Sequence, residues 1–218
     1  MQVCTIYDGD KMRRTKEDAE QTRRDILGAA MDIFSEKGYS KTTFDEIAKH
    51  INLTKGAVYW HFRNKPDIVA ALINHFAELY VSRIREFLER HQQMEFQTII
   101  DMQLFNNKML REDQLFYKFI FFVTSQMEWS EAILNKVAPS IAETKKITRN
   151  LILDILQKLQ QNKKIKEDVD VGLICEILMT MYGGMLDGFF TKSLQYSFDE
   201  LVQTGFNLIY NNIKAEGV

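Results

Sequence analysis

Residues 42–67 read TTFDEIAKHINLTKGAVYWHFRNKPD and contain two short helical patterns separated by a break. Thr43 and Glu46 have the spacing of a capping box, which predicts that a helix begins directly after Thr43. Thr54 can cap a second helix in the same way. Two short helices joined by so tight a turn are typical of a helix-turn-helix, which we expect over about 44–62.

The outward face of the second helix is predicted to carry Thr54, Lys55, Tyr59 and His61. These side chains are hydrogen-bond donors plus one aromatic ring, a set that suits phosphate oxygens and base edges in a DNA major groove. The alternative is an ordinary helical hairpin with a polar outer face, because this geometry also occurs without DNA. Spacing alone leaves both interpretations open.

The residue types in this stretch favour the first interpretation. The run KGAVYWHF at 55–62, followed by Asn64 and Lys65, resembles the recognition helix of the TetR family of bacterial transcription regulators. Its YWHF variant is most similar to the AcrR-like branch of that family, which controls multidrug efflux. The resemblance runs from about Arg13 to Ile73. It includes Thr22-Arg23-Arg24, Ala29-Ala30, Phe34, Lys37-Gly38-Tyr39, Thr42-Thr43 and Ile47-Ala48.

The resemblance implies an all-α chain of about nine helices, in which a three-helix DNA-binding domain is joined by a continuous helix to a ligand-binding and dimerisation domain. It implies a homodimeric repressor that leaves a palindromic double-stranded DNA operator when a small hydrophobic or amphipathic inducer binds. The alternative on the same fold is a ligand-independent or activating regulator. The DNA contacts that we expect are Thr42, Thr43, Thr54, Lys55, Gly56, Tyr59, Trp60, His61 and Lys65.

Composition and charge agree with this interpretation. The chain has 218 residues, 45% of them hydrophobic, with only 2 prolines and 10 glycines, which favours a mostly helical fold. Residues 11–66 hold 12 Lys and Arg against 8 Asp and Glu, whereas residues 67–218 hold 16 against 20. A basic N-terminal part on an acidic remainder fits one nucleic-acid-facing domain.

Other classes of function find little support in the sequence. No nucleophile elbow, metalloprotease motif, Gly-rich phosphate loop or Cys/His cluster is present, so we expect neither an enzyme nor a cofactor or metal site. Cys4 and Cys175 are far apart in the sequence and suggest no disulfide framework, as expected in a reducing cytoplasm. No secretory signal and no run of about 18 apolar residues is evident, so we expect a cytoplasmic protein without a membrane span.

Domain boundaries follow from the helical patterns. We expect a disordered arm over 1–11, the DNA-binding domain over 12–66 and the second domain over 67–218. The first helix should run from Thr15 to Lys37 and end at a left-handed Gly38.

Asn64 can cap the helix that enters the second domain, with Pro66 in its first turn and its end near Gln92. Residues 95–127 are apolar on every side and should be buried. We expect a looser connection from Trp129 to Pro139, a helix that Pro139 opens, and two last helices over 168–191 and 198–214.

The second domain carries seven methionines and eighteen aromatic residues. Adaptable Met side chains and large apolar cavities are common where varied ligands bind, although a helical core can use the same residues as filler. The resemblance favours an inducer pocket among the middle helices. Asp101, Glu128 and Asp187 are possible counter-charges for a cationic ligand. The predicted pocket residues are Met102, Phe105, Met109, Phe116, Phe119, Ile120, Val123, Met127, Tyr182 and Phe189.

The last two helices combine apolar residues with Gly172, Gly183, Gly184 and Gly188. Interior glycines cost helix stability, so they suggest a close helix approach or space for a ligand. The resemblance implies a homodimer formed through these two helices. The alternative is a monomer whose terminal helices cover its own core.

Overall fold

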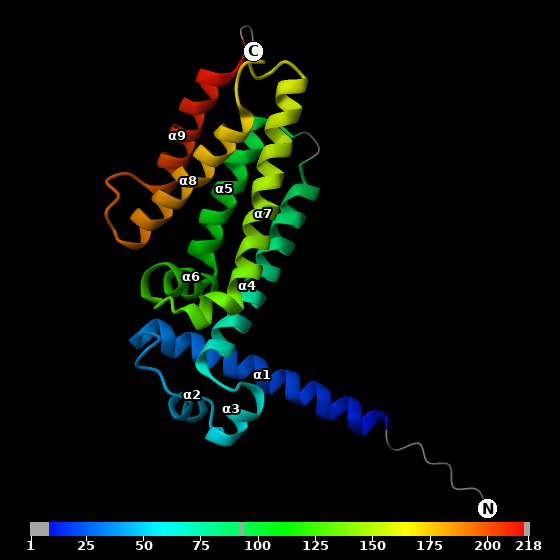
Figure 1. Cartoon of the computed structure of the whole chain (residues 1–218), viewed down its shortest axis with the longest axis vertical. Helices are drawn as coiled ribbons and strands as arrows, with labels where there is room; N and C mark the ends of the chain where they lie inside the picture. The colour runs from blue at the N-terminus through cyan, green and yellow to red at the C-terminus, as the bar shows by residue number, and fades with distance from the viewer. Residues whose placement is uncertain (1–8, 92–93, 216–218) are drawn as a thin grey trace, which may run out of the picture.

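The computed structural model describes residues 9–91 and 94–215, with side chains from residue 16 onward. The described part is all-α, as predicted, and contains nine α-helices and one π-helical turn (Figure 1). Within it the β-type pairing is a single isolated bridge between Ile165 and Lys214. The helices are α1 (Gly9–Lys37), α2 (Phe44–His50), α3 (Lys55–His61), α4 (Lys65–Glu89), α5 (Phe96–Glu112), α6 (Gln114–Phe121), the π-helical turn η1 (Phe122–Gln126), α7 (Glu131–Gln161), α8 (Val171–Phe190) and α9 (Phe198–Ile213).

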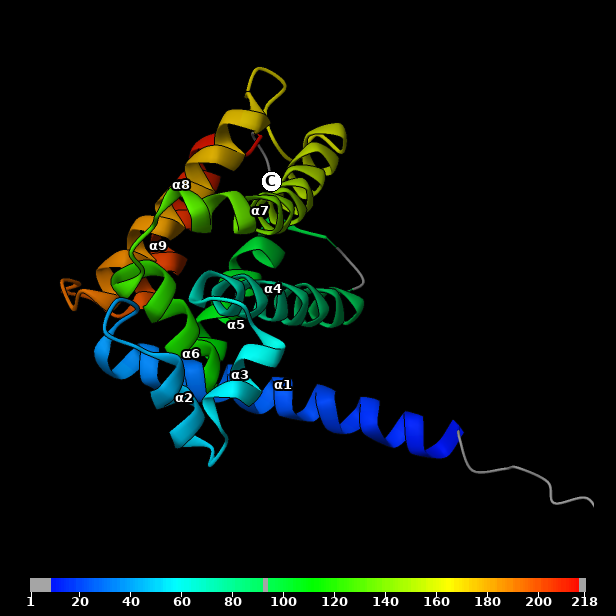
Figure 2. The ribbon, with the colours of Figure 1, turned by 60° about the horizontal axis from the view of Figure 1, so that its bottom comes forward.

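Helix α1 begins earlier than the sequence pattern indicates. It starts at Gly9 rather than at Thr15, so residues 9–11 of the expected arm are helical, whereas residues 1–8 lie outside the described part. Its N-terminal turns extend away from the other helices in both views (Figures 1 and 2). The helix ends as predicted, because Gly38 adopts the left-handed φ of 85° and its N–H donates to the carbonyl of Phe34 at 2.9 Å.

Helices α1, α2 and α3 form the N-terminal unit, whose buried apolar residues belong to the same cluster as those of the C-terminal part. Ile26, Ala30 and Phe34 of α1 are fully buried and belong to one cluster with Ile47 of α2 and Val58 of α3. The pattern i, i+4, i+8 on α1 supplies the apolar stripe that this packing needs.

Helix α4 leaves the N-terminal unit without a linker. Asn64 caps it by accepting a hydrogen bond from the N–H of Asp67, and Pro66 lies in its first turn, as predicted. The helix ends at Glu89, three residues before the predicted end near Gln92, which lies outside the described residues. Helix α4 packs mainly along α7, and Figure 1 shows the two side by side.

The expected loose connection up to Pro139 is wrong. Helix α7 begins at Glu131, and Pro139 is the ninth of its 31 residues. A proline in a helix interior removes one backbone hydrogen bond and crowds the preceding turn. Burial of Ile133 and Val137 on the inner face of α7 holds the first two turns in place despite that cost.

Helices α8 and α9 form the outer layer of the C-terminal part, beside α5 (Figure 1). Contrary to the expectation that no segment could span a membrane, α8 is long and apolar enough by length and composition to do so. It also carries Glu176, which pairs with Arg149 of α7 at 2.5 Å. Only 22% of its most apolar window is buried within the chain, so α8 leaves much apolar surface uncovered.

Candidate nucleic-acid interface and internal cavity

The helix-turn-helix has the caps that the sequence predicts. The Thr43 hydroxyl accepts from the N–H of Glu46, and the Glu46 carboxylate accepts from the N–H of Thr43, which completes a capping box. The Thr54 hydroxyl caps α3 by accepting from the N–H of Ala57 at 3.2 Å. Between the helices, Asn52 takes a left-handed φ of 56°, which turns the chain within a few residues.

Helix α3 presents a polar and aromatic outer face. Lys55, Gly56, Tyr59 and Trp60 are exposed, with Tyr59 51% and Trp60 75% accessible. Tyr and Trp are enriched at interfaces, because their rings combine a large apolar body with a polar tip, so this exposed pair suits a contact.

Two contacts orient this face. The Tyr59 ring packs on the Phe44 ring of α2, with 4.7 Å between the ring centroids. The Nζ atom of Lys55 lies 5.7 Å from the centroid of the Tyr59 ring. His61 is half-buried, and burial together with the nearby Arg23 guanidinium lowers the pKa of its imidazole. Uncharged imidazole at neutral pH can still donate one hydrogen bond.

Three residues that the sequence assigns to this interface have structural partners. The Thr42 side chain is buried, and its hydroxyl donates to the carbonyl of Gly38 at 2.9 Å. Thr43 is the capping residue of α2. The Lys65 ammonium donates to the carbonyls of Tyr39 at 2.8 Å and Ser40 at 3.1 Å.

Lys65 also lies 4.5 Å from the ring centroid of Tyr39, and burial lowers the pKa of its amine. Lys65 therefore ties the start of α4 to the α1–α2 loop and has little capacity left for another partner.

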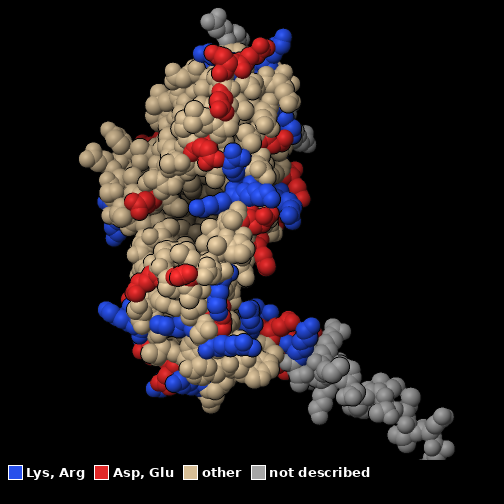
Figure 3. Space-filling view, in the orientation of Figure 1, with Lys and Arg blue, Asp and Glu red and all other residues tan. Residues whose placement is uncertain are grey.

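Exposed cations surround α3. Arg23 on α1 lies over the ring of Phe62 at 5.0 Å, and Lys41 and Arg63 are exposed on the flanking loops. Figure 3 shows Lys and Arg side chains gathered over the N-terminal unit, where acidic side chains are fewer. A basic surface around an exposed helix attracts the phosphate backbone of DNA.

A largely apolar cavity of about 360 Å³ lies within the C-terminal part, between α4, α5, α6, α7 and α8. That size is in the usual range for small-molecule sites. Figure 3 shows a hollow in the surface at the level of these helices. The lining residues are Ile73, Phe76, Ala77, Tyr80, Asn106, Leu110, Phe116, Phe119, Ile120, Val123, Ile141, Thr144, Lys145, Thr148, Met179, Tyr182 and Leu186.

Half of the predicted pocket residues line this cavity, and they are Phe116, Phe119, Ile120, Val123 and Tyr182. The other five lie elsewhere. Met102 and Met109 are buried in packing, Phe105 stacks on Phe87 at 5.3 Å, Met127 follows η1, and Phe189 stacks on Phe198 at 5.3 Å.

The three acidic residues suggested as counter-charges are also absent from the lining. Asp101 accepts from Gln97, Glu128 accepts from Ser40, and Asp187 is exposed on α8.

Apart from Tyr182, the polar residues of the cavity were not predicted from the sequence. Tyr80 comes from α4, Asn106 from α5, and Thr144, Lys145 and Thr148 from α7. The only local signal was the i, i+4 spacing of Thr144 and Thr148, which places both hydroxyls on one face of α7. Burial raises the pKa of the Tyr80 and Tyr182 hydroxyls, so both stay protonated at neutral pH.

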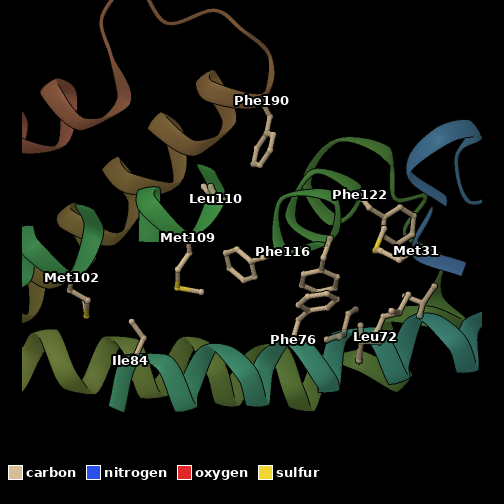
Figure 4. Packing of buried hydrophobic residues seen from close by; sticks show 14 of the residues in the cluster. Met31, Leu72, Phe76, Ile84, Met102, Met109, Leu110, Phe116, Phe122 and Phe190 are labelled. Atoms are coloured by element: carbon tan, nitrogen blue, oxygen red, sulfur yellow. The ribbon is translucent and has the colours of Figure 1, made fainter. Parts of the chain in front are cut away.

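Direct packing links the cavity to the N-terminal unit. Phe76 on α4 stacks on Phe119 of α6 at 4.0 Å, and both rings line the cavity. Beyond α6, Phe122 of η1 stacks on Phe34 of α1 at 5.0 Å. Figure 4 shows Phe76 directed toward α6 and Phe122 against Met31 of α1.

Polar bonds join the same elements. Lys118 of α6 pairs with Asp32 of α1 at 2.6 Å, and the Gln126 amide donates to the carbonyl of Ser35 at 3.1 Å. Lys136 of α7 pairs with Asp67 in the first turn of α4. The first two bonds tie α6 and η1 to the N-terminal unit, and the third ties α7 to the start of α4, the helix that leaves this unit.

The outer face of α8 and α9 carries exposed apolar side chains. Leu173 is 56% and Leu208 60% accessible, and Ile177 is also exposed. Gly183 and Gly184 face open space, because a Cβ atom on either would meet nothing within 4 Å. Gly188 differs, since a Cβ there would lie 2.5 Å from Leu194, so this glycine serves close packing within the chain.

Comparison with known proteins identifies the N-terminal part. Residues 26–72 match the family model described as bacterial regulatory proteins, tetR family. Over 69 residues the chain is 44% identical to the HTH-type transcriptional regulator TtgR of Pseudomonas putida, a match that covers 32% of this chain and 33% of TtgR. The chain thus matches only about a third of the length of that relative.

A probable acrEF/envCD operon repressor of Escherichia coli is 26% identical over 196 residues, which cover 84% of this chain and 83% of that protein.

Solved structures share the whole fold. NalD, the secondary repressor of the MexAB-OprM multidrug efflux pump in Pseudomonas aeruginosa, superposes with a TM-score of 0.72 at 19% identity, over 91% of this chain and all of NalD. The SmeT–triclosan complex superposes with a TM-score of 0.73 at 19% identity, over 90% of this chain and 93% of SmeT. At such identities the likeness establishes the fold alone.

Proposed function

We propose that the chain, whose residues 26–72 match the model of the TetR family of bacterial regulatory proteins, is a homodimeric repressor released from DNA by a small hydrophobic or amphipathic ligand. The observation that carries the proposal is α4. This single helix begins four residues after α3 ends, and its side chains from Ile73 to Tyr80 line the cavity. A ligand in the cavity therefore touches the helix that positions the DNA-binding face.

We assign DNA binding to residues 12–66, with α3 in the major groove. Lys55, Tyr59 and Trp60 are the proposed contacts to bases and phosphates, because they are exposed and already oriented. Thr42, Thr43 and Lys65 act by holding the shape of the unit, since their polar atoms bond within it. Arg23, Lys41 and Arg63 supply further phosphate contacts.

We assign ligand binding and dimerisation to residues 67–218. The exposed apolar face of α8 and α9 supports a two-fold interface, in which Gly183 and Gly184 let helices of two subunits approach closely. A two-fold dimer presents two copies of α3 to half-sites about 34–36 Å apart, which requires a palindromic operator. Such a repressor acts on chromosomal DNA, so the proposed location is the cytoplasm.

The relatives support a role in controlling efflux. NalD represses a multidrug efflux pump, and the probable repressor from Escherichia coli is named for the acrEF/envCD operon. We propose an efflux system as the regulated target here, with an inducer that enters the apolar cavity. Triclosan, which forms a complex with SmeT, is a suitable probe for it.

Release follows from a shift between two arrangements of the dimer. In one arrangement the two α3 helices fit both half-sites, and in the other they do not. A ligand moves this balance only by binding the second arrangement more tightly. A coupling of about 1–3 kcal/mol would weaken DNA binding about 5- to 150-fold.

Fluorescence anisotropy with labelled DNA from the region upstream of the gene tests the proposal. We expect a salt-dependent complex that saturating triclosan weakens at least fivefold. The exposed substitution Lys55→Ala should weaken the complex, whereas Lys108→Ala, an equally exposed lysine on α5, should not. Absence of any complex specific to that DNA over a scrambled duplex would refute the repressor role.

A further inference from the structure

One buried oxygen atom in the cavity lining accepts no hydrogen bond within the described part of the chain. Asn106 is only 8% exposed. Its Oδ1 atom is buried and has no hydrogen-bond partner within the described part of the chain. Its amide nitrogen is engaged, because it donates to Oε1 of Gln103 at 3.0 Å. A buried carbonyl oxygen without a partner is costly, so a cavity that holds one is suited to a ligand that donates to it.

The Tyr80 hydroxyl is hydrogen-bonded with the side chains of Thr148 and Asn106, and the three other hydroxyl groups of the lining donate elsewhere. Thr144 donates to the carbonyl of Ser140 at 2.9 Å, and Thr148 donates to the carbonyl of Thr144 at 3.2 Å. The Tyr182 hydroxyl donates to Asn107 at 3.0 Å. These protons are used within the chain, which leaves acceptor lone pairs facing the cavity.

The charge of the lining is the second, independent observation. Among the described residues that line the cavity, Lys145 is the only charged one and none is a carboxylate. Lys145 is exposed at residue level, which places its ammonium at the edge of the cavity rather than deep in it. A cationic ligand would meet like charge at the rim and would lose its hydration inside without a counter-ion.

We propose that the ligand is an apolar compound with a hydroxyl group, uncharged or anionic, whose hydroxyl donates to Oδ1 of Asn106. The proposal rests on the proposed function in that it names the ligand class of the same cavity. The aromatic or aliphatic body of the ligand fills the space between Phe76, Phe119 and Ile120. An ammonium compound of the same size could also donate a hydrogen bond to Asn106. It should bind poorly, because its charge would be desolvated without a counter-ion and would meet Lys145 at the rim.

Isothermal titration calorimetry of the full chain with three matched probes tests this inference. The probes are para-phenylphenol, its methyl ether and biphenylmethylammonium, which share one apolar body. We expect the phenol to bind about two- to tenfold more tightly than the ether, the gain of one neutral hydrogen bond. The ammonium compound should bind about tenfold or more weakly than the phenol.

Variants locate the effect. Asn106→Leu should remove the preference for the phenol over the ether, whereas Met179→Leu, which alters the same lining without polar atoms, should keep it. Lys145→Gln should reduce the penalty on the ammonium compound, and the neighbouring Lys146→Gln, outside the lining, should leave it unchanged. The measurements on the parent decide the matter even if Asn106→Leu folds poorly.

Each remaining outcome has a distinct meaning. Equal affinity for phenol and ether in the parent, or tight binding of the ammonium compound, would overturn the inference while leaving a ligand-responsive repressor in place. Failure of all three probes to bind would count against the cavity as the ligand site and thus against both proposals. An unchanged preference in Asn106→Leu would place the acceptor of the ligand's hydrogen bond elsewhere and overturn the role of Asn106.

Discussion

Lys65 and Lys55 are ten residues apart, both flank α3, and their replacement by alanine should have opposite consequences. The Lys65 ammonium donates to the carbonyls of Tyr39 and Ser40 and lies over the Tyr39 ring. Lys55 is exposed and, apart from its contact with the Tyr59 ring, faces solvent. We expect Lys65→Ala to destabilise the fold and Lys55→Ala to weaken only DNA binding.

The magnitude for Lys65→Ala follows from two hydrogen bonds that involve a charged donor. Each such bond contributes about 1.5–3 kcal/mol when well buried, but Lys65 is half-buried, so solvent can satisfy part of the loss. After this reduction we expect Lys65→Ala to lower the free energy of unfolding by about 2 kcal/mol. For a chain of this length it corresponds to a melting temperature lower by about 4–8 °C.

The assay is thermal unfolding by circular dichroism at one fixed protein concentration, paired with DNA anisotropy at several salt concentrations below the melting transition. Lys55→Ala should melt with the parent and lower the slope of log affinity against log salt by about 0.9, one phosphate contact. Lys65→Ala should melt earlier and keep the parent slope. A parental melting temperature in Lys65→Ala together with a reduced salt slope would refute the structural role and return Lys65 to the phosphate contacts.

Three further predictions concern other parts of the molecule. Burial works against ionisation of Asp199, but hydrogen bonds from Arg111 and Asn107 hold the pKa of its carboxyl below the ordinary 3.8. A depressed carboxyl pKa contributes stability above about pH 4, and this stability is lost as the pH falls further. The urea midpoint of Asp199→Asn should therefore fall less than that of the parent between neutral pH and about pH 3. Pro139→Ala should raise the urea midpoint by restoring a helical N–H within α7, with a gain of up to about 3 kcal/mol, and an unchanged midpoint would mean that the helix has already adapted. Leu208→Glu should yield a folded monomer in sedimentation velocity, whereas Leu134→Glu on α7 should remain dimeric, and a dimeric Leu208→Glu would argue against the α8–α9 interface.

The helix-turn-helix could be predicted from the sequence because its signals are local. The capping box of Thr43 and Glu46, the cap at Thr54 and the left-handed Gly38 act within four residues, so their spacing alone fixes where helices begin and end. The exposed face of α3 followed from the same helical period.

Tertiary packing decided the features that the sequence did not indicate. Pro139 opens a helix in most local contexts, yet burial of Ile133 and Val137 extends α7 through it. The roles of Thr42 and Lys65 depend on carbonyls that only the folded α1–α2 loop brings near them. Their residue types alone were equally consistent with DNA contacts.

The cavity was half predictable for a related reason. Apolar residues of α6 and η1 stood out as a run without a polar face, and three from α6 and one from η1 line the cavity. Met102 and Phe105 of α5 have the same character but point into packing, which depends on how helices of distant sequence are rotated against each other. The polar lining from α4 and α7 needed the three-dimensional arrangement of five helices.

Thermodynamic coupling between the cavity and the DNA-binding face through α4 can be measured from the ligand side. The measurement is the dissociation constant of triclosan by calorimetry, first for the free chain and then for the chain saturated with its upstream DNA. Because linkage is mutual, we expect DNA to weaken triclosan binding by the same factor, about 5- to 150-fold, by which triclosan weakens DNA binding. Equal triclosan affinity in the two states would mean that the two sites are not coupled, even if both ligands bind well on their own.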